Sequence, residues 1–100
     1  MSQSQNNTAV QDKVKVQKPK EYKVIIHNDD YTPMEFVISV LVSIFKKGPA
    51  EAYEITMNVH KKEKGIAGIY TRDVAQTKMT QANAAATENK FPLKCTMEPN

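Results

Sequence analysis

The strongest constraint on the fold is a change of apolar period on either side of residues 28–33, which read NDDYTP. Before this stretch, Tyr22, Val24 and Ile26 alternate with other residues, and a period of 2 with β-branched side chains predicts a strand. After it, apolar residues recur at helical spacing over residues 34–45 and predict an amphipathic helix. A short polar turn therefore joins a strand directly to a helix.

The start of this helix has the pattern of a capping box. We expect Thr32 to be the N-cap residue, Pro33 to occupy the first helical position and the Glu35 side chain to reach back to the cap amide. Two lysines followed by Gly48 predict the end of the helix, and Pro49 predicts the start of a second one.

The remaining elements follow from the same two periods. The second helix is closed by the polar run at residues 61–64 with Gly65, and the glycine-punctuated segment 65–71 predicts a strand that approaches a neighbour closely. Thr71 can cap a third helix, and the alternation in residues 91–98 predicts a last strand. The order βααβαβ predicts an α+β fold, with a small three-stranded antiparallel sheet and three helices packed on it.

Composition separates a tail from a core. Residues 1–20 are polar and carry no aromatic side chain, which predicts a disordered tail, and residues 21–100 are expected to form a single domain. The net charge of +3 belongs to the tail, because four of the fourteen basic and one of the eleven acidic residues lie there. The core therefore holds ten of each and has no overall field for nucleic acid.

Several functional classes lack their residues. No segment is long and apolar enough to cross a membrane or to form a signal-peptide core, and the lone Cys95 fits a reducing compartment, so we expect a cytoplasmic protein. We also expect a monomer. No nucleophile motif is present, which argues against an enzyme. A metal site built from His27, Asp29, Asp30 and His60 is disfavoured by their spacing, and we expect no cofactor.

Two adjacent aspartates, Asp29 and Asp30, lie in the turn before the first helix, and their role has two possible explanations. Asp29 and Asp30 could cap the following helix, or they could face a cation. Asn28 and Asp29, with His60 on the second helix, would rim an apolar patch with acceptor groups, as in a small binding pocket. The apolar candidates could each be ordinary core when taken singly; they are Thr32, Met34, Val37, Val59 and Leu93.

Four motifs occur in order along the chain: IIHNDDYTPMEFVISVL, MNVH, GIYTRDVAQTK and a terminal PLKCTME. Together they closely resemble ClpS, the adaptor family that delivers N-degron substrates to the ClpA-type unfoldase of a bacterial protease. The resemblance spans about residues 21–98, and the βααβαβ order is also that of the family. It implies that the acids face a cation, the free α-ammonium of a substrate whose first residue is Leu, Phe, Tyr or Trp.

The resemblance also implies residue roles. The positions matching Asn28, Asp29 and His60 hold the amino group, and an acid and a lysine matching Asp73 and Lys78 dock the unfoldase. The family's tail is fed to the unfoldase. The side-chain pocket is formed at the positions of Thr32, Met34, Val37, Thr56, Val59 and Leu93, with the methionine acting as a gate against β-branched first residues.

The chain departs from the family pattern at two positions. Thr56 stands where the family commonly has methionine, which predicts a shorter and more polar pocket wall. Glu63 stands where a glycine is often found three residues after the histidine.

Two other classes remain as alternatives at this stage. A small interaction domain of ribosomal-stalk type shares the α+β layering and needs no pocket for an amine. A nucleic-acid binder would need a basic face on the core, against which the charge balance argues.

Overall fold

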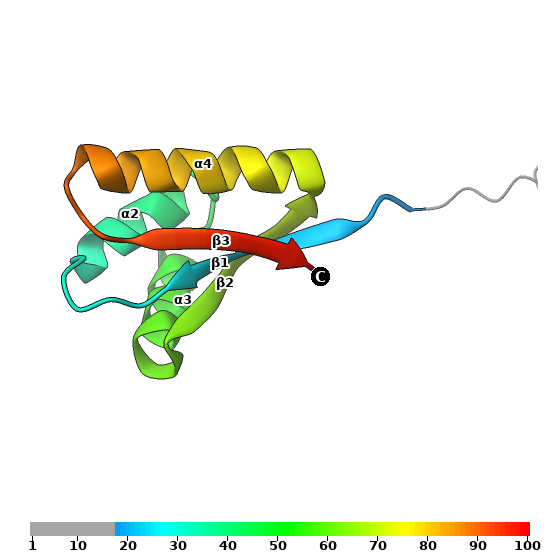
Figure 1. The fold of residues 1–100 in the computed structure, drawn as a ribbon. Helices are drawn as coiled ribbons and strands as arrows, with labels where there is room; N and C mark the ends of the chain where they lie inside the picture. The colour runs from blue at the N-terminus through cyan, green and yellow to red at the C-terminus, as the bar shows by residue number, and fades with distance from the viewer. Residues whose placement is uncertain (1–17) are drawn as a thin grey trace, which may run out of the picture.

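The computed structural model describes residues 18–100, and Figure 1 shows the arrangement of their helices and strands. The strands are β1 (Glu21–His27), β2 (Lys64–Thr71) and β3 (Lys94–Pro99). The helices are α2 (Met34–Ser43), α3 (Pro49–Lys62) and α4 (Arg72–Glu88). The predicted βααβαβ order and α+β class are confirmed. Most of the predicted disordered tail, residues 1–17, lies outside the described residues.

The first strand is the centre of the sheet. The strand order is β2-β1-β3, and both pairings are antiparallel. Val24 and Ile26 on β1 are fully buried, and Ile26 lies opposite Gly65 on one side and Cys95 on the other. The chain that leaves the end of β1 after His27 therefore emerges from the middle of the sheet.

All three helices contribute to one core with the sheet. The long helix α4 lies along the sheet in Figure 1 and contacts all three strands. Its buried face consists of alanines, Ala75, Ala82 and Ala86, which allow a close approach of helix to sheet. The largest buried aliphatic side chains come from α2 and β1, and burial of each stabilises the fold by about 1.5–3 kcal/mol.

The predicted capping box is wrong. Pro33 occupies the N-cap position of α2, the helix begins at Met34, and no side chain accepts a hydrogen bond from the first turn. The Thr32 hydroxyl instead donates to Asp29 Oδ2 over 2.8 Å. A carboxylate that binds the hydroxyl and the amide of Thr32 makes the turn without a side-chain cap.

Other boundaries differ by a few residues. Helix α2 ends at Ser43, earlier than its apolar stripe suggests, although Phe45 is still buried. Thr71 does occupy the N-cap position of α4, but its side chain makes no capping hydrogen bond. Strand β3 starts one residue after Leu93 and is fixed to α4 by Asn83, whose amide group bonds both the N–H and the carbonyl of Cys95.

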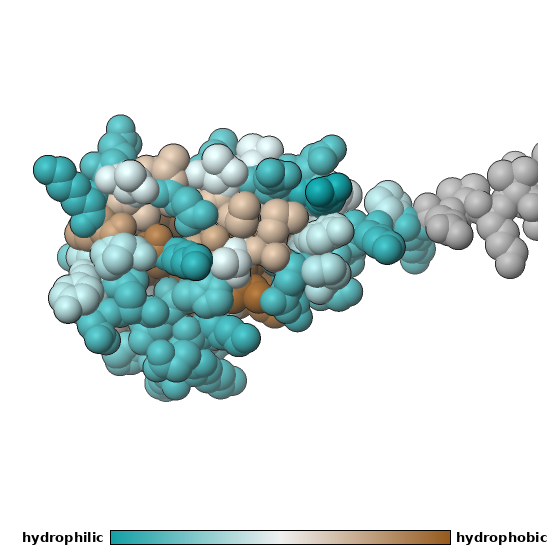
Figure 2. All heavy atoms as spheres, viewed as in Figure 1, coloured by the Kyte–Doolittle hydropathy of each residue, from teal (hydrophilic) through white to brown (hydrophobic). Residues whose placement is uncertain are grey.

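Close backbone approach at the predicted glycine strand is confirmed at Gly65. A Cβ atom there would lie 2.9 Å from Val59 Cγ2, so a side chain would push β2 away from α3. Figure 2 shows that hydrophilic side chains cover the end of α3, at the bottom of the view. None of the helices in residues 18–100 has the length and apolar character needed to cross a membrane.

Candidate functional site

The loop between β1 and α2 is organised by the carboxylate of Asp29. Its Oδ1 accepts hydrogen bonds from the amides of Tyr31 at 2.8 Å and Thr32 at 2.7 Å, and its Oδ2 accepts the Thr32 hydroxyl at 2.8 Å. The carboxylate thus lies inside the turn, and hydrogen bonds to the loop fix the orientation of both of its oxygens. Asp30 is exposed at the same turn.

The same contacts keep Asp29 ionised. Partial burial alone would raise its pKa, but the backbone amides of Thr32 and Tyr31 and the Thr32 hydroxyl outweigh this effect and lower the pKa below its ordinary value. Each carboxylate oxygen has two acceptor positions, so the three bonds to the loop leave capacity for a further donor. Asp29 is therefore a fixed negative charge that can still accept a hydrogen bond.

A cavity of about 230 Å³ opens beside this loop. It brings together segments that are far apart in the sequence, namely the end of β1 with its loop, the start of α2, the second half of α3 and the residue before β3. All nine residues expected at the amine site and the side-chain pocket line it: Asn28, Asp29, Thr32, Met34, Val37, Thr56, Val59, His60 and Leu93.

The lining of the cavity is divided by burial. Val37, Val59 and Leu93 are buried and form an apolar wall. Asp29 and Asn28 are half-buried, His60 is exposed, and these three carry the acceptor groups of the rim. The arrangement can hold a cationic donor at the rim and an apolar group inside, which a purely apolar cavity cannot do.

A backbone contact joins the two elements that carry the rim residues. The amide of Asn28 donates to the carbonyl of Glu63 over 2.8 Å. Glu63 follows the last turn of α3, which carries His60. The end of β1 and the end of α3 are therefore fixed side by side.

The wall at Thr56 differs from the expectation. Thr56 is 2% exposed, and its hydroxyl donates to the carbonyl of Ala52 in its own helix over 2.8 Å. The hydroxyl proton is therefore used within α3, and Thr56 has no free hydrogen-bond donor for the cavity. This bond reduces the polarity expected of the wall, and the shorter wall stays a prediction.

Two lining residues, His27 and Asp30, were not assigned to the pocket from the sequence. His27 Nε2 lies 2.7 Å from Thr96 Oγ1, which fixes the ring at the sheet side of the cavity. Its position directly before Asn28 at the end of β1 was the available signal. His27, Asp29, Asp30 and His60 all line the cavity, yet no three His, Cys, Asp or Glu side chains within residues 18–100 are grouped so as to hold a metal ion.

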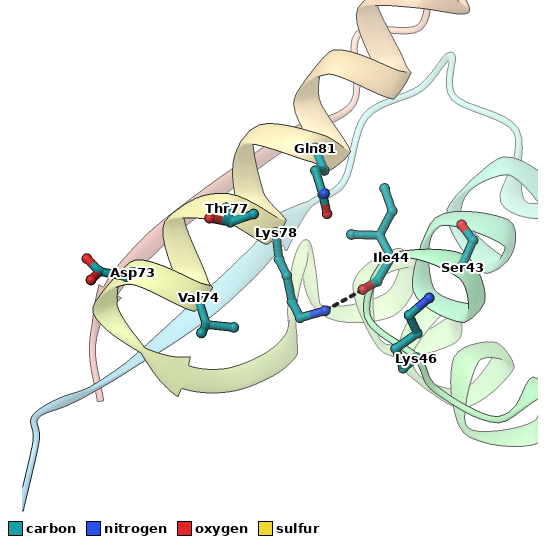
Figure 3. Close-up of a pocket in the computed structure, with 8 residues that line it drawn as sticks. All are labelled: Ser43, Ile44, Lys46, Asp73, Val74, Thr77, Lys78 and Gln81. Atoms are coloured by element: carbon teal, nitrogen blue, oxygen red, sulfur yellow. Dashed lines mark hydrogen bonds between the residues drawn. The ribbon is translucent and has the colours of Figure 1, made fainter.

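The other two candidate residues lie on a different surface. Asp73 and Lys78 line a shallow hollow of about 570 Å³ between α4 and the end of α2, shown in Figure 3. In Figure 3 the two side chains point in different directions. The Lys78 ammonium donates to the carbonyl of Ile44 over 2.7 Å and lies 5.4 Å from the centre of the Tyr70 ring. The Lys78 ammonium therefore has its partner outside its own helix.

Cys95 is buried on β3, facing the core. Burial raises the pKa of its thiol to about 12, so the reactive thiolate is scarce at neutral pH. The side chain behaves as a small core hydrophobe, as its place in the alternating strand predicts.

The family model described as ATP-dependent Clp protease adaptor protein ClpS matches residues 17–96. The chain belongs to the ClpS family. One relative, the ATP-dependent Clp protease adapter protein ClpS of Clostridium acetobutylicum, is 53% identical over 88 residues, covering 88% of this chain and 87% of that protein. The ClpS of Desulfotalea psychrophila is 45% identical over 94 residues, covering 94% of this chain and 92% of that protein.

A solved structure of the family has the same fold. Agrobacterium tumefaciens ClpS2, bound to L-phenylalaninamide, superposes with a TM-score of 0.80 at 38% identity, covering 83% of this chain and all of that one. The family resemblance seen in the sequence is confirmed, and membership of ClpS replaces the alternatives of a ribosomal-stalk-type domain and a nucleic-acid binder.

Proposed function

We propose that the protein, as a ClpS-family adaptor of a Clp protease, captures the free N-terminus of N-degron substrates in the 230 Å³ cavity. The observation that carries the proposal is the union, in one cavity, of a carboxylate, an amide and an imidazole at the rim with an apolar wall inside. ClpS2 of Agrobacterium tumefaciens supports it, because L-phenylalaninamide has a free α-amino group and an apolar side chain.

The rim suits an α-ammonium group. An α-amino group has a pKa of about 7.7–8.0 and is mostly cationic at pH 7. Asp29 supplies the opposite charge from a fixed position, and Asn28 and His60 supply neutral acceptors for the remaining protons. An internal peptide bond carries no such cation, so the rim selects true N-termini.

The inner wall suits one bulky apolar side chain. We assign the pocket to first residues Leu, Phe, Tyr and Trp, whose burial stabilises the complex by about 1.5–3 kcal/mol. Met34 is 39% exposed at the mouth of the cavity, where it can contact an entering side chain and act as a gate against β-branched residues. Thr32, Val37, Thr56, Val59 and Leu93 complete this pocket.

The partner is assigned to the opposite end of the molecule. We assign docking of the N-terminal domain of a ClpA-type unfoldase to the hollow that contains Asp73 and Lys78, and hand-over of cargo to residues 1–20. The adaptor performs no catalytic step in this scheme. We assign its action to the cytosol, because a single free thiol is typical of proteins in a reducing compartment.

Binding of matched peptides tests the proposal. Peptides that begin with Phe or Leu are expected to bind, and their N-acetylated forms are expected not to, because acetylation removes the cation. Peptides that begin with Ala measure the contribution of the pocket separately. Equal binding of free and acetylated Phe-peptides would show that the cavity does not recognise an amine.

A further inference from the structure

The described residues include three non-glycine positions with left-handed backbone, and each follows a helix. Lys46 follows α2 with φ 59°, Glu63 follows α3 with φ 72°, and Lys90 follows α4 with φ 63°. A lysine at such a position interacts favourably with the negative end of the helix, whereas a glutamate is repelled by it. A non-glycine residue also pays for the left-handed conformation. Glu63 is thus the one of the three that is unfavourable on both counts.

Glu63 is also the one that touches the amine site. Its carbonyl accepts the amide of Asn28 over 2.8 Å, so its Cα is held next to a rim residue of the cavity. None of the three residues lines the cavity, but only Glu63 is bonded to a lining residue. Residues that break a local rule are expected at functional or strained sites.

The surroundings of Glu63 explain what a negative charge can do there. Lys61, Lys62 and Lys64 are its immediate neighbours along the chain, and all of them are exposed. Figure 2 shows hydrophilic side chains over this end of α3. Lys64 lies opposite His27 of the cavity lining, and Lys61 directly follows His60, so these cations can repel an approaching α-ammonium. Glu63 is the only carboxylate among residues 61–64.

We propose that Glu63 is a specificity-determining residue of the adaptor, whose carboxylate offsets the repulsion of the incoming α-ammonium by the lysines at the end of α3 while its backbone carbonyl holds Asn28 in place. The inference rests on the proposed function of the cavity. It assigns to an exposed residue outside the cavity lining a share in recognising the cation, at the expense of helix stability.

Two variants at the position separate charge from backbone. Glu63→Gln removes the charge and keeps a side chain that must adopt a positive φ, whereas Glu63→Gly removes the charge and relieves the backbone. Both variants are expected to bind a Phe-peptide about two- to fivefold more weakly than the parent at low salt, because exposed charge interactions are small. The loss should disappear near 1 M salt, where screening acts within about 3 Å.

The controls come from the same chain. Glu21→Gln removes one negative charge at the far end of β1, six residues or about 20 Å from His27, and should leave affinity unchanged. Lys90→Gly relieves a left-handed backbone at the end of α4 and should also leave affinity unchanged. Glu63→Gly is expected to raise Tm by about 2–6 °C, and Glu63→Gln by less, because glutamine relieves only the repulsion by the helix end.

The outcomes distinguish the role of Glu63 from recognition of the amine by the cavity. An equal, salt-sensitive loss in both Glu63 variants, with none in Glu21→Gln, supports the inference. Unchanged affinities, a loss that persists near 1 M salt, a loss confined to Glu63→Gly, or an equal loss in Glu21→Gln overturns the role of Glu63 while leaving an acetylation-sensitive cavity intact. A parent protein that binds free and acetylated peptides equally overturns the amine site and this inference with it.

Discussion

The cavity beside β1 and the hollow between α2 and α4 each contain a charged side chain that is hydrogen-bonded to the backbone. They differ in role, because the charge at the cavity keeps hydrogen-bonding capacity for a ligand and the charge at the hollow joins two parts of the fold. At the cavity, the carboxylate of Asp29 is bonded on its loop side and keeps acceptor capacity toward the rim. At the hollow, the Lys78 ammonium is bonded to the Ile44 carbonyl, and this contact joins α4 to the end of α2. One charge is held in place and remains available for a ligand, whereas the other is part of the framework.

The comparison shows that a residue at a docking position of the family can support the docking surface by stabilising the fold, without contacting the partner itself. Asp73 is exposed at the first turn of α4 and free to meet a partner directly, whereas Lys78 is half-buried and already has a backbone partner. Substitutions at the cavity should therefore change ligand affinity first, and substitutions of Lys78 should change stability as well as docking.

The largest effect is expected from Asp29→Ala. Removal of one partner of a desolvated charge pair costs about 2–5 kcal/mol in affinity. The substitution also removes the acceptor of three loop hydrogen bonds, so the loop and Met34 after it lose their position. Calorimetric titration with a Phe-peptide should show a loss of at least thirtyfold in a folded variant.

Asp29→Asn sharpens this prediction by separating charge from loop geometry. The asparagine oxygen can still accept the amides of Tyr31 and Thr32, and the Thr32 hydroxyl can rotate to accept from the new amide. We expect an affinity between those of the parent and Asp29→Ala. An asparagine variant that binds as tightly as the parent would remove the carboxylate charge from recognition.

The sequence predicts the fold well because the spacing of apolar residues agrees with the positions of the glycines and prolines that begin or end the helices and strands. The helix that begins at Pro49, the close approach at Gly65 and the element order needed only these local signals. Local chemistry at the first turn was misread, because a carboxylate three residues before Thr32 competes for the group that a capping box needs. The competition depends on how the loop folds back, which spacing alone does not show.

The site shows the same division. Nine of the eleven residues that line the cavity were predicted from the family resemblance, since segments brought together by the fold carry no common local signal. His27 and the Asn28–Glu63 contact were missed, because strand register and the left-handed exit from α3 decide them. The hydrogen bond from Lys78 to the Ile44 carbonyl was not predicted for a similar reason, since the two residues are 34 positions apart in the sequence.

A smaller effect is expected from Thr56→Met, which fills part of the cavity. The side chain is almost fully buried in the wall, so a longer one must extend into the 230 Å³ space. We expect the ranking of Leu-, Phe-, Trp-, Ile- and Val-initiated peptides to shift by about 1–3 kcal/mol against the bulkiest and the β-branched residues. An identical ranking in both proteins would show that the parent pocket is not relaxed at this wall.

Thr56→Val is the matched control. It keeps the shape of the side chain and removes only the hydroxyl that donates to Ala52. Because the hydroxyl proton is already donated to the Ala52 carbonyl, the peptide ranking should stay that of the parent. A changed ranking in this variant would show that the hydroxyl faces the ligand after all.

Lys78→Ala is expected to act on stability as well as on docking. Loss of a hydrogen bond from a charged donor to the Ile44 carbonyl should lower the free energy of unfolding by about 1–2 kcal/mol. Asp73→Ala should cost less, at about 0.3–1 kcal/mol, because it only loses a favourable place at the start of α4. Chemical denaturation of both variants measures the difference.

Docking and ligand binding should separate in the double variant of Asp73 and Lys78. Binding of a Phe-peptide should equal that of the parent, since neither residue lines the cavity, while capture by the unfoldase's N-terminal domain falls. Loss of peptide affinity in the folded double variant would contradict the division between the two regions. Equal stability of Lys78→Ala and Asp73→Ala would contradict the structural role of Lys78.

The smallest effect is expected from pH between 7 and 5. The lowered pKa of Asp29 means that its contribution to stability is present above the unfolded-state pKa and is lost only as pH falls through the folded-state pKa, below about pH 4. Asp29 therefore stays charged across the range, and the ligand's ammonium does too. An imidazole that is protonated loses its acceptor lone pair and repels a cationic ligand, so His60 is the rim group through which acid can weaken binding.

We accordingly expect the affinity for a Phe-peptide to fall by about 0.5–1.5 kcal/mol as pH falls from 7 to 5. His60→Ala should remove most of this dependence, at the cost of weaker binding at pH 7. His27→Gln is the control, because His27 lines the same cavity but is bonded to Thr96 on the sheet side. A pH dependence that persists in His60→Ala and disappears in His27→Gln would transfer the acid sensitivity to the sheet side of the cavity and remove the imidazole of α3 from the cation site.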